Sequence, residues 1–354
     1  MAGARTVTTV APELERATET ARELIRAAST GRPPRSVVPV GAGTDAEVGN
    51  PVVAAGGTPA IVRAPAGVVR HDVADMTVTV GGGTSCAELD EVLSLAGQEC
   101  PLDPRTADAT VGGVLAAGLS GPRRLRLGPV REWVLEVRFM TADGRLVLGG
   151  GPTVKNVSGY DLPRLLVGSL GTLGLIVQVT LRCRPRSKSS VWAVREGSPD
   201  GLRDVLFAPS SLLWDGRRVH VLLEGHPVDI DAQLAAGALQ PAGAAPAWPA
   251  GPHRGRVSVP PGSVVSLGAA LRSIEGCGWL SEIGVGTVHV ACDTQAGLRD
   301  ARDAAHAVGG WLLREAGATA LDGFGRALPN IEVMRRIKKA FDPSGVLSPG
   351  RLPL

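Results

Sequence analysis

The sequence contains very little lysine and no strong excess of charge of either sign. Lysine supplies only four of the 37 basic residues, which face 34 acidic residues and leave a formal net charge of +3. A protein that binds nucleic acid through phosphate contacts normally carries a strongly basic patch or chain. We therefore expect no nucleic acid among the partners.

Cysteine and long apolar runs are also scarce. The five cysteines (Cys86, Cys100, Cys183, Cys277 and Cys292) form no C-x-x-C pair, so we expect neither an iron–sulfur cluster nor another metal site within this chain. Scattered free thiols are typical of a reducing cytoplasm. No run of about 18 apolar residues occurs, and the N-terminus lacks the apolar core of a signal peptide. The sequence thus predicts a cytoplasmic protein without a membrane span, with any membrane association made through partners.

Glycine and proline, by contrast, are abundant. The 47 glycines and 27 prolines give 74 of 354 residues, well above the average of ~12%. This composition disfavours an all-helical bundle, and the 44% of hydrophobic residues argues against disorder. At about 150 residues per domain, the length indicates two domains. The sequence predicts a loop-rich α+β protein.

Apolar periodicity places the main elements. The expected helices lie at 12–28, 87–96 and 331–341, and the expected strands at 36–40, 76–80, 134–139, 145–148 and 175–184. The strands at 134–139 and 145–148 form a hairpin, and Asn330 is positioned to cap the last helix. Beyond about residue 186 the composition changes, and short strand-like and helix-like tracts alternate.

A glycine-rich loop follows the first expected strand. Gly41-Ala42-Gly43-Thr44-Asp45-Ala46 fits G-x-G-x-x-A, which in a Rossmann site opens a helix that faces a pyrophosphate. The residues that follow are poor helix formers, which disfavours a nicotinamide dehydrogenase, since that fold requires a helix over 44–56. A loop whose backbone N–H groups contact a phosphate directly requires no helix. A plain turn is the third interpretation.

Two further glycine-rich tracts and the tail stand out. The tract 103–128 contains Thr110-Val111-Gly112-Gly113 and continues into Arg123 and Arg124, whose guanidinium groups can meet anions or be solvated. The tract 154–174 holds the single tyrosine, Tyr160, and glycines three residues apart near its end. By itself, each tract and the tail FDPSGVLSPGR (341–351) indicates only a turn or a tight loop.

Taken in this order, the tracts resemble the PCMH-type FAD-binding fold of the vanillyl-alcohol-oxidase superfamily, and within it the FAD-binding E subunits of bacterial glycolate oxidases. The likeness is carried by GPRRLRLGPVREWVL (121–135) and GGGPTVKNVSGYDLPRLLVGSLGTLGLIVQVTLRCRP (149–185). It covers about 36–186 and 331–351 and is weak in between. The resemblance implies a two-subdomain FAD-binding domain over 1–186, a small α+β (ferredoxin-like) cap over 187–320, and a C-terminal segment, 321–354, that returns to the FAD domain.

The resemblance also implies which residues bind FAD. They are Gly41, Ala42, Gly43, Thr44, Asp45, Pro101, Asp103, Thr110, Val111, Gly112, Gly113, Ala117, Gly118, Gly121, Gly128, Val130, Gly171, Gly174 and Ile176. Candidates near the substrate or the flavin ring are Arg123, Arg124, Lys155 and Tyr160, each of which could equally be structural. No histidine lies in the loops where relatives attach flavin covalently, so we expect non-covalent FAD.

Departures from the family pattern leave two functions open. Leu170 stands where catalytic relatives carry Glu in G-S-E-G-T-L-G, and Gly284-Val285-Gly286-Thr287-Val288-His289 stands in place of their G-D-G-N-L-H. The first hypothesis is an FAD-dependent oxidoreductase acting on CH–OH groups, alone or within a complex. It oxidises a small 2-hydroxy acid such as glycolate or D-lactate and passes electrons to a separate iron–sulfur subunit. The alternative is an FAD-binding, non-catalytic subunit that stabilises a catalytic homologue.

Overall fold

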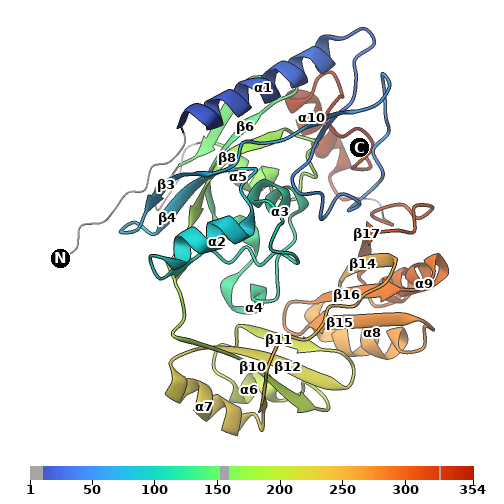
Figure 1. Cartoon of the computed structure of the whole chain (residues 1–354). Helices are drawn as coiled ribbons and strands as arrows, with labels where there is room; N and C mark the ends of the chain where they lie inside the picture. Colours follow the sequence, from blue (N-terminus) through green and yellow to red (C-terminus); the bar gives the residue numbers. More distant parts are fainter. Residues whose placement is uncertain (1–10, 152–158, 327) are drawn as a thin grey trace.

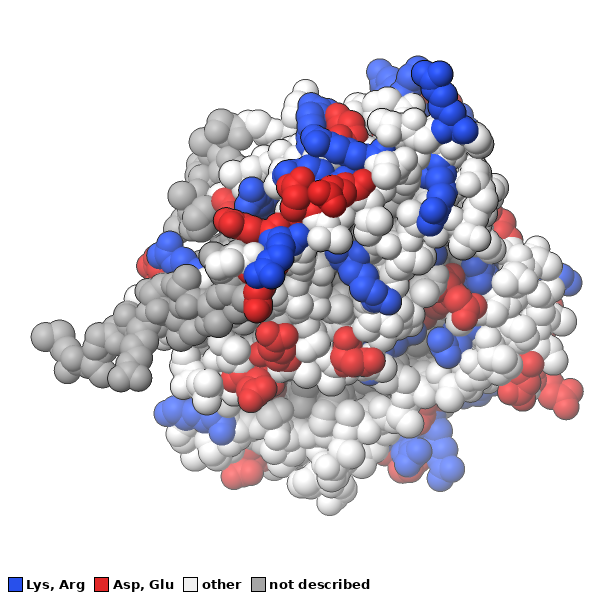
Figure 2. All heavy atoms as spheres, turned by 45° about the horizontal axis from the view of Figure 1, so that its top comes forward, with Lys and Arg blue, Asp and Glu red and all other residues white. Residues whose placement is uncertain are grey.

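The computed structural model describes residues 11–151, 159–326 and 328–354. These residues form two parts, each built on its own antiparallel sheet and joined by the chain just beyond residue 185 (Figure 1). The described part of the chain contains no helix with the length and apolarity that a membrane span requires. Basic and acidic side chains are interspersed on the face shown in Figure 2.

The first part is centred on a five-stranded sheet with the order β3-β4-β8-β6-β7. Its strands are β3 (Val68–Asp72), β4 (Thr77–Gly81), β6 (Val134–Met140), β7 (Leu146–Gly150) and β8 (Leu175–Arg182). The central strand β8 is buried on both faces. Its register against β6 shifts between Arg138 and Phe139, and such a bulge turns the side chains beyond it to the other face.

Helices cover both faces of this sheet (Figure 1). On one face, α1 (Ala11–Thr30) packs Ala21 and Ile25 against Val177. On the other, α2 (Cys86–Ser94) and α3 (Val111–Ala117) pack against Val179 and Leu181. The smaller elements are β1 (Val37–Pro39), β2 (Ala60–Val62), β5 (Gln98–Glu99), α4 (Arg124–Leu127), η1 (Val130–Trp133), α5 (Leu162–Leu166), β9 (Arg184–Pro185) and α10 (Ile331–Phe341). The strands β1 and β2 pair in parallel, and Leu347 of the C-terminal tail bridges to β1.

The second part is an eight-stranded sheet in which one folding unit occurs twice. The strand order is β13-β10-β12-β11-β15-β16-β14-β17. The first unit consists of β10 (Ser189–Glu196), α6 (Leu202–Val205), β11 (Ser211–Trp214), β12 (Arg218–Gly225), α7 (Pro227–Ala236) and β13 (Gln240–Ala242). The second consists of β14 (His253–Ser258), η2 (Pro261–Ser263), α8 (Val264–Leu271), β15 (Cys277–Glu282), β16 (Thr287–Cys292), α9 (Gln295–Ala307) and β17 (Trp311–Ala316). Each unit pairs its fourth, first, third and second strands in that order, which is the ferredoxin-like topology.

The two units join edge to edge over a short seam. Only Leu213 with Glu282 and Trp214 with Ser281 pair between β11 and β15. The rings of Trp214 and Trp279 meet edge to face with centroids 5.3 Å apart. The α+β fold is therefore confirmed, but the second part is larger than the single small ferredoxin-like cap expected from the resemblance.

Some of the other sequence expectations are confirmed and others are wrong. The predicted helices and strands named above are confirmed, with their ends shifted by no more than two residues. Residues 44–50 form turns and no helix follows up to residue 56, so the nicotinamide dehydrogenase interpretation is wrong. The 103–128 tract contains α3, because the Thr110 side chain caps this helix by accepting from the Gly113 N–H. Asn330 precedes α10 in a left-handed conformation without a side-chain cap.

Candidate functional site

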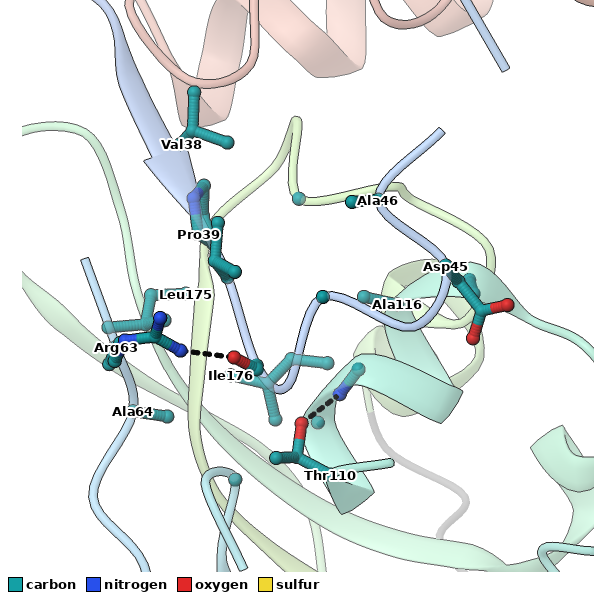
Figure 3. Close-up of a pocket in the computed structure, with 18 of the residues that line it drawn as sticks. Val38, Pro39, Asp45, Ala46, Arg63, Ala64, Thr110, Ala116, Leu175 and Ile176 are labelled. Atoms are coloured by element: carbon teal, nitrogen blue, oxygen red, sulfur yellow. Dashed lines mark hydrogen bonds between the residues drawn. The ribbon is translucent and has the colours of Figure 1, made fainter. Parts of the chain in front are cut away.

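A cavity opens where several glycine-rich segments of the first part meet (Figure 3). We call it the glycine cavity. It is bordered by the loop after β1, the glycines after β4, one side of α3 and the turn before β8. The residues expected to bind FAD that line it are Gly41, Ala42, Gly43, Thr44, Asp45, Thr110, Gly112, Gly113, Ala117, Gly171, Gly174 and Ile176.

Close packing explains why glycine occupies positions 41 and 112 of this cavity. A methyl group on Gly41 would lie 2.0 Å from Thr110 Oγ1, and one on Gly112 would lie 2.8 Å from the carbonyl oxygen of Gly82. Neither position has room for a side chain. The end of β4 and the start of α3 therefore meet backbone to backbone, and the loop after β1 packs against the Thr110 side chain. Together these segments form a cradle rich in glycine.

The loop Gly41–Asp45 lines this cavity and carries backbone N–H groups that the described part of the fold leaves without partners. Within the described residues, none of its five backbone N–H groups has a hydrogen-bond acceptor. Arg63 donates to the carbonyl oxygen of Gly41 (Figure 3), and Arg351 Nε donates to that of Val48 at 2.9 Å. Clustered free N–H groups with guanidinium groups nearby form an anion site. The residues present therefore fit the pyrophosphate of FAD.

A second cavity of about 300 Å³ adjoins the loop at Asp45 and lies between the two parts. We call it the arginine cavity, because Arg105, Arg123 and Arg256 line it together with Trp248 and His289. Burial raises the pKa of Asp45 above its ordinary value, although the nearby Arg105 opposes that change. A neighbouring third cavity shares Asp45, Arg105, Trp248 and His289 with it.

One wall of the arginine cavity is a chain of polar contacts. Arg105 pairs with Glu315 at 2.6 Å and contacts Nδ1 of His289 at 3.1 Å. Because a guanidinium group only donates hydrogen bonds, Nδ1 is the acceptor. The other ring nitrogen, Nε2, then carries the hydrogen and donates to Glu282 at 2.7 Å. The geometry thus fixes the tautomer of His289.

Arg256 differs from the other arginines of this cavity. It lies on β14 directly opposite His289 of β16. Its guanidinium group has no hydrogen bond or ion pair to any residue that the structure describes. Burial lowers the pKa of Arg256, while the carboxylates of Glu315 and Glu282 oppose this shift. A half-buried guanidinium group without a fixed partner is suited to a carboxylate ligand.

The four candidates for the chemistry have different locations. Arg123 lines the arginine cavity but is already paired with Asp103, Glu99 and Glu224. Burial lowers the pKa of Arg123, but the bonds to Asp103 and Glu99 outweigh this and raise it. Arg124 is half-buried in α4 and Tyr160 is 90% exposed, and neither lines any of the three cavities. Lys155 lies outside the described residues.

The remaining expected FAD residues fall into two groups. Asp103 and Gly121 line the arginine cavity. Those that line none of the three cavities are Pro101, Val111, Gly118, Gly128 and Val130. Val111 and Val130 are buried in the core beside the five-stranded sheet, and Gly118 ends α3 in a left-handed conformation.

Sequence reasoning missed other lining residues. In the glycine cavity these are Val38, Pro39, Val40, Ala46, Arg63, Ala64, Gly82, Gly83, Ala116, Leu170, Leu175, Ser348 and Arg351. The Gly81-Gly82-Gly83 run was a usable signal for the second segment of the cradle. Arg105 and Arg256 carry no local motif, because distant parts of the chain bring them together. His289 closes the Gly284–His289 run, which was its only signal.

Comparison with known proteins supports the cofactor. Residues 14–149 match the FAD binding domain model, and residues 326–352 match the model of the C-terminal domain of FAD linked oxidases. Glycolate oxidase subunit GlcE of Escherichia coli (strain K12) is 39% identical over 158 residues, which cover 44% of each chain. D-lactate dehydrogenase of Archaeoglobus fulgidus is 41% identical over 116 residues, which cover 32% of this chain and 26% of the relative.

One further relative and one solved structure extend the comparison. Glycolate oxidase subunit GlcD of Bacillus subtilis (strain 168) is 30% identical over 163 residues, covering 45% of this chain and 34% of its own. The chain thus spans less than half the length of the curated relatives it matches. A solved structure of alkyldihydroxyacetonephosphate synthase superposes with a TM-score of 0.67 at 15% identity, covering 94% of this chain and 76% of the other. That likeness concerns the fold.

Proposed function

Because this chain carries an FAD binding domain and the C-terminal segment of FAD linked oxidases, we propose that it is the FAD-carrying subunit of an oxidoreductase that oxidises a small 2-hydroxy acid. In this proposal, residues 1–186 and 321–354 hold the cofactor, and residues 187–320 cover the substrate. Relatives named glycolate oxidase subunit and D-lactate dehydrogenase support the substrate class.

The glycine cavity provides the cofactor site of the proposal. The free N–H groups of Gly41–Asp45 would hold the pyrophosphate, with Arg63 and Arg351 fixing the shape of the loop. Among the described residues that line this cavity there is no histidine, which supports non-covalent attachment. Bound FAD supplies the acceptor for the hydride equivalent from the substrate carbon.

The observation that carries the substrate assignment is the unpaired guanidinium group of Arg256 beside the FAD loop. Arg256 and Asp45 line the same cavity, so a carboxylate held by Arg256 would lie next to the cofactor site. His289 is the proposed proton acceptor for the substrate hydroxyl. Its Nδ1 lone pair accepts from Arg105, so we propose that the bound substrate displaces this guanidinium group from Nδ1. Glu282, bonded to Nε2, would stabilise the positive charge that the ring then acquires.

The electron acceptor is proposed to be a separate subunit. Two of the relatives are named as subunits of glycolate oxidase, GlcE and GlcD, which supports an assembly of several chains. We propose a catalytic FAD homologue and an iron–sulfur subunit as partners.

A non-catalytic FAD-binding subunit is the second candidate. It is favoured by Leu170, which lines the glycine cavity where catalytic relatives carry a carboxylate, and by the Gly284–His289 run with its altered residues. In that case this chain would stabilise a catalytic homologue instead of reacting with the acid.

Anaerobic reduction of the FAD-loaded protein distinguishes the two candidates. We expect glycolate or D-lactate to bleach the visible flavin band. Arg256→Gln should slow reduction at limiting acid by about 100-fold, because the charged hydrogen bonds to the carboxylate are lost, while FAD content stays the same. The matched control is Arg217→Gln, an arginine of the turn between β11 and β12 whose side chain is 82% accessible.

Two outcomes would overturn parts of this proposal. If the FAD-loaded protein is not bleached by any 2-hydroxy acid, the non-catalytic candidate replaces the oxidoreductase. If Arg256→Gln is reduced as fast as the unchanged protein, the carboxylate site lies elsewhere.

A further inference from the structure

Two cysteines face each other across a pair of neighbouring strands in the second part. Cys277 begins β15 and Cys292 ends β16, and the two residues are directly opposite in the antiparallel register. Their sulfur atoms lie 3.0 Å apart. Both thiols are free, and neither residue lines the glycine cavity or the arginine cavity.

This backbone arrangement suits a disulfide. Opposite residues of antiparallel strands have Cα atoms roughly 4.5–5.5 Å apart, and disulfides span Cα separations of about 4.4–6.8 Å. A bond of about 2.05 Å between the sulfur atoms therefore requires only a small movement of the side chains. The hydrogen-bonded ladder from Cys277–Cys292 to Glu282–Thr287 can remain in place.

The two thiols are not equivalent. Cys292 is fully buried beneath α9, while Cys277 is partly exposed at the end of the sheet. The Cys292 thiol donates its hydrogen bond to the Cys277 sulfur, which favours the thiolate of Cys277. This bond is also the main cause that lowers the pKa of Cys277, while burial opposes the shift. A partly exposed thiolate attacks disulfides, and a buried neighbouring thiol resolves the product.

We propose that Cys277 and Cys292 form a thiol–disulfide exchange site that reacts with low-molecular-weight disulfides. The Cys277 thiolate attacks one sulfur of the small disulfide, forms a mixed disulfide and releases one small thiolate. Cys292 then loses its proton and attacks the Cys277 sulfur, which closes the intramolecular bond and releases the second small thiolate. The two protein thiols are oxidised by two electrons, and the small disulfide is reduced to two thiols.

The bond would fasten the open end of the β15–β16 hairpin. This hairpin supplies Glu282 and His289 to the arginine cavity wall, and the bond would join two cysteines that are 15 positions apart in the sequence. Such a crosslink restricts the unfolded chain, so the oxidised form should unfold at a higher temperature.

Peptide mapping of the full chain with oxidised glutathione tests the proposal. The protein is reduced, freed of reductant, incubated with oxidised glutathione, alkylated and digested. We expect a peptide pair joined through Cys277 and Cys292, with Cys86, Cys100 and Cys183 alkylated, and full reversal by dithiothreitol. Alkylation of both Cys277 and Cys292 after this treatment, or a bond between other cysteines in their place, would overturn the proposal.

Single serine variants test the order of the steps. Cys292→Ser should accumulate glutathione on Cys277, because the resolving thiol is absent, whereas Cys277→Ser should leave Cys292 unmodified. If the buried Cys292→Ser variant fails to fold, the partly exposed Cys277→Ser variant still tests the proposal. Its melting temperature should not respond to oxidised glutathione, while that of the unchanged protein should rise. An equal rise in both would contradict the proposal.

Discussion

At the scale of single residues, glycines and arginines have different roles in the site: the glycines allow close packing, and the arginines provide charge. Gly41 and Gly112 are required by close approach, since a side chain at either would collide with Thr110 or with the Gly82 carbonyl group. These positions could be predicted from sequence because a glycine run leaves a local pattern. Arg256 could not, because an isolated arginine has no pattern and its role depends on β14 lying beside β16.

The collision at Gly41 gives a direct prediction. Gly41→Ala should weaken FAD binding by about tenfold or more, because overpacking a fitted site costs about 1–3 kcal/mol. The ratio of flavin to protein absorbance after gel filtration measures the loss. Gly262→Ala is the control, since a methyl group there meets no atom within 4 Å. A Gly41→Ala protein with full FAD content would contradict the packing argument.

At the scale of elements, hydrophobic alternation located β8 but did not show on which face of the sheet each of its side chains lies. Leu175 and Val177 pack beside α1, whereas Val179 and Leu181 pack beside α2 and α3. The bulge between β6 and β8 causes the change, and a bulge has no sequence signature strong enough to be predicted. The helix α3 was missed for a related reason, since glycines in its first turn conceal the helical pattern.

The turn between β11 and β12 yields a prediction about pH. Asp215 accepts from the backbone N–H groups of Arg217 and Arg218 at 2.9 and 2.6 Å. Burial raises the pKa of Asp215, but these bonds outweigh it and hold that pKa below its ordinary value of 3.8. The stability from ionised Asp215 is therefore present above pH 3.8 and is lost as the pH falls through the lowered pKa.

Asp215→Asn tests this dependence. The variant should be about 1 kcal/mol less stable than the unchanged protein at neutral pH. This difference in stability should disappear at acidic pH, where both side chains are neutral. Melting temperatures across an acid series provide the measurement. A gap that stays constant at every pH would show that the charge of Asp215 does not stabilise the turn.

At the scale of the whole molecule, buried ion pairs join the two parts. Arg123 of the first part binds Asp103 and Glu99 on its own side and Glu224 of β12 on the other. Arg105 similarly reaches Glu315 and His289. The resemblance predicted that a second part covers the FAD domain, but not that it is built of two ferredoxin-like units, because their sequences share no visible repeat.

Arg123→Gln should loosen this connection. The substitution leaves Asp103 and Glu224, both mostly buried, without their cation and leaves Glu99 with Arg184 alone. Breaking comparable buried pairs costs about 3–5 kcal/mol. Calorimetry should then show unfolding at a lower temperature, with the two parts no longer melting together. Arg217→Gln, which affects only an exposed ion pair with Glu196, should leave the transition unchanged. An unaltered transition for Arg123→Gln would mean that other contacts hold the parts together.

The account depends most on FAD occupying the glycine cavity without a covalent bond. The most direct measurement is the visible absorption spectrum of the purified, untagged protein, before heat denaturation and in the supernatant afterwards. We predict the bands of oxidised flavin in the native protein and their full release as FAD on heating. A colourless protein that takes up no added FAD, or flavin that stays with the denatured chain, would contradict the account.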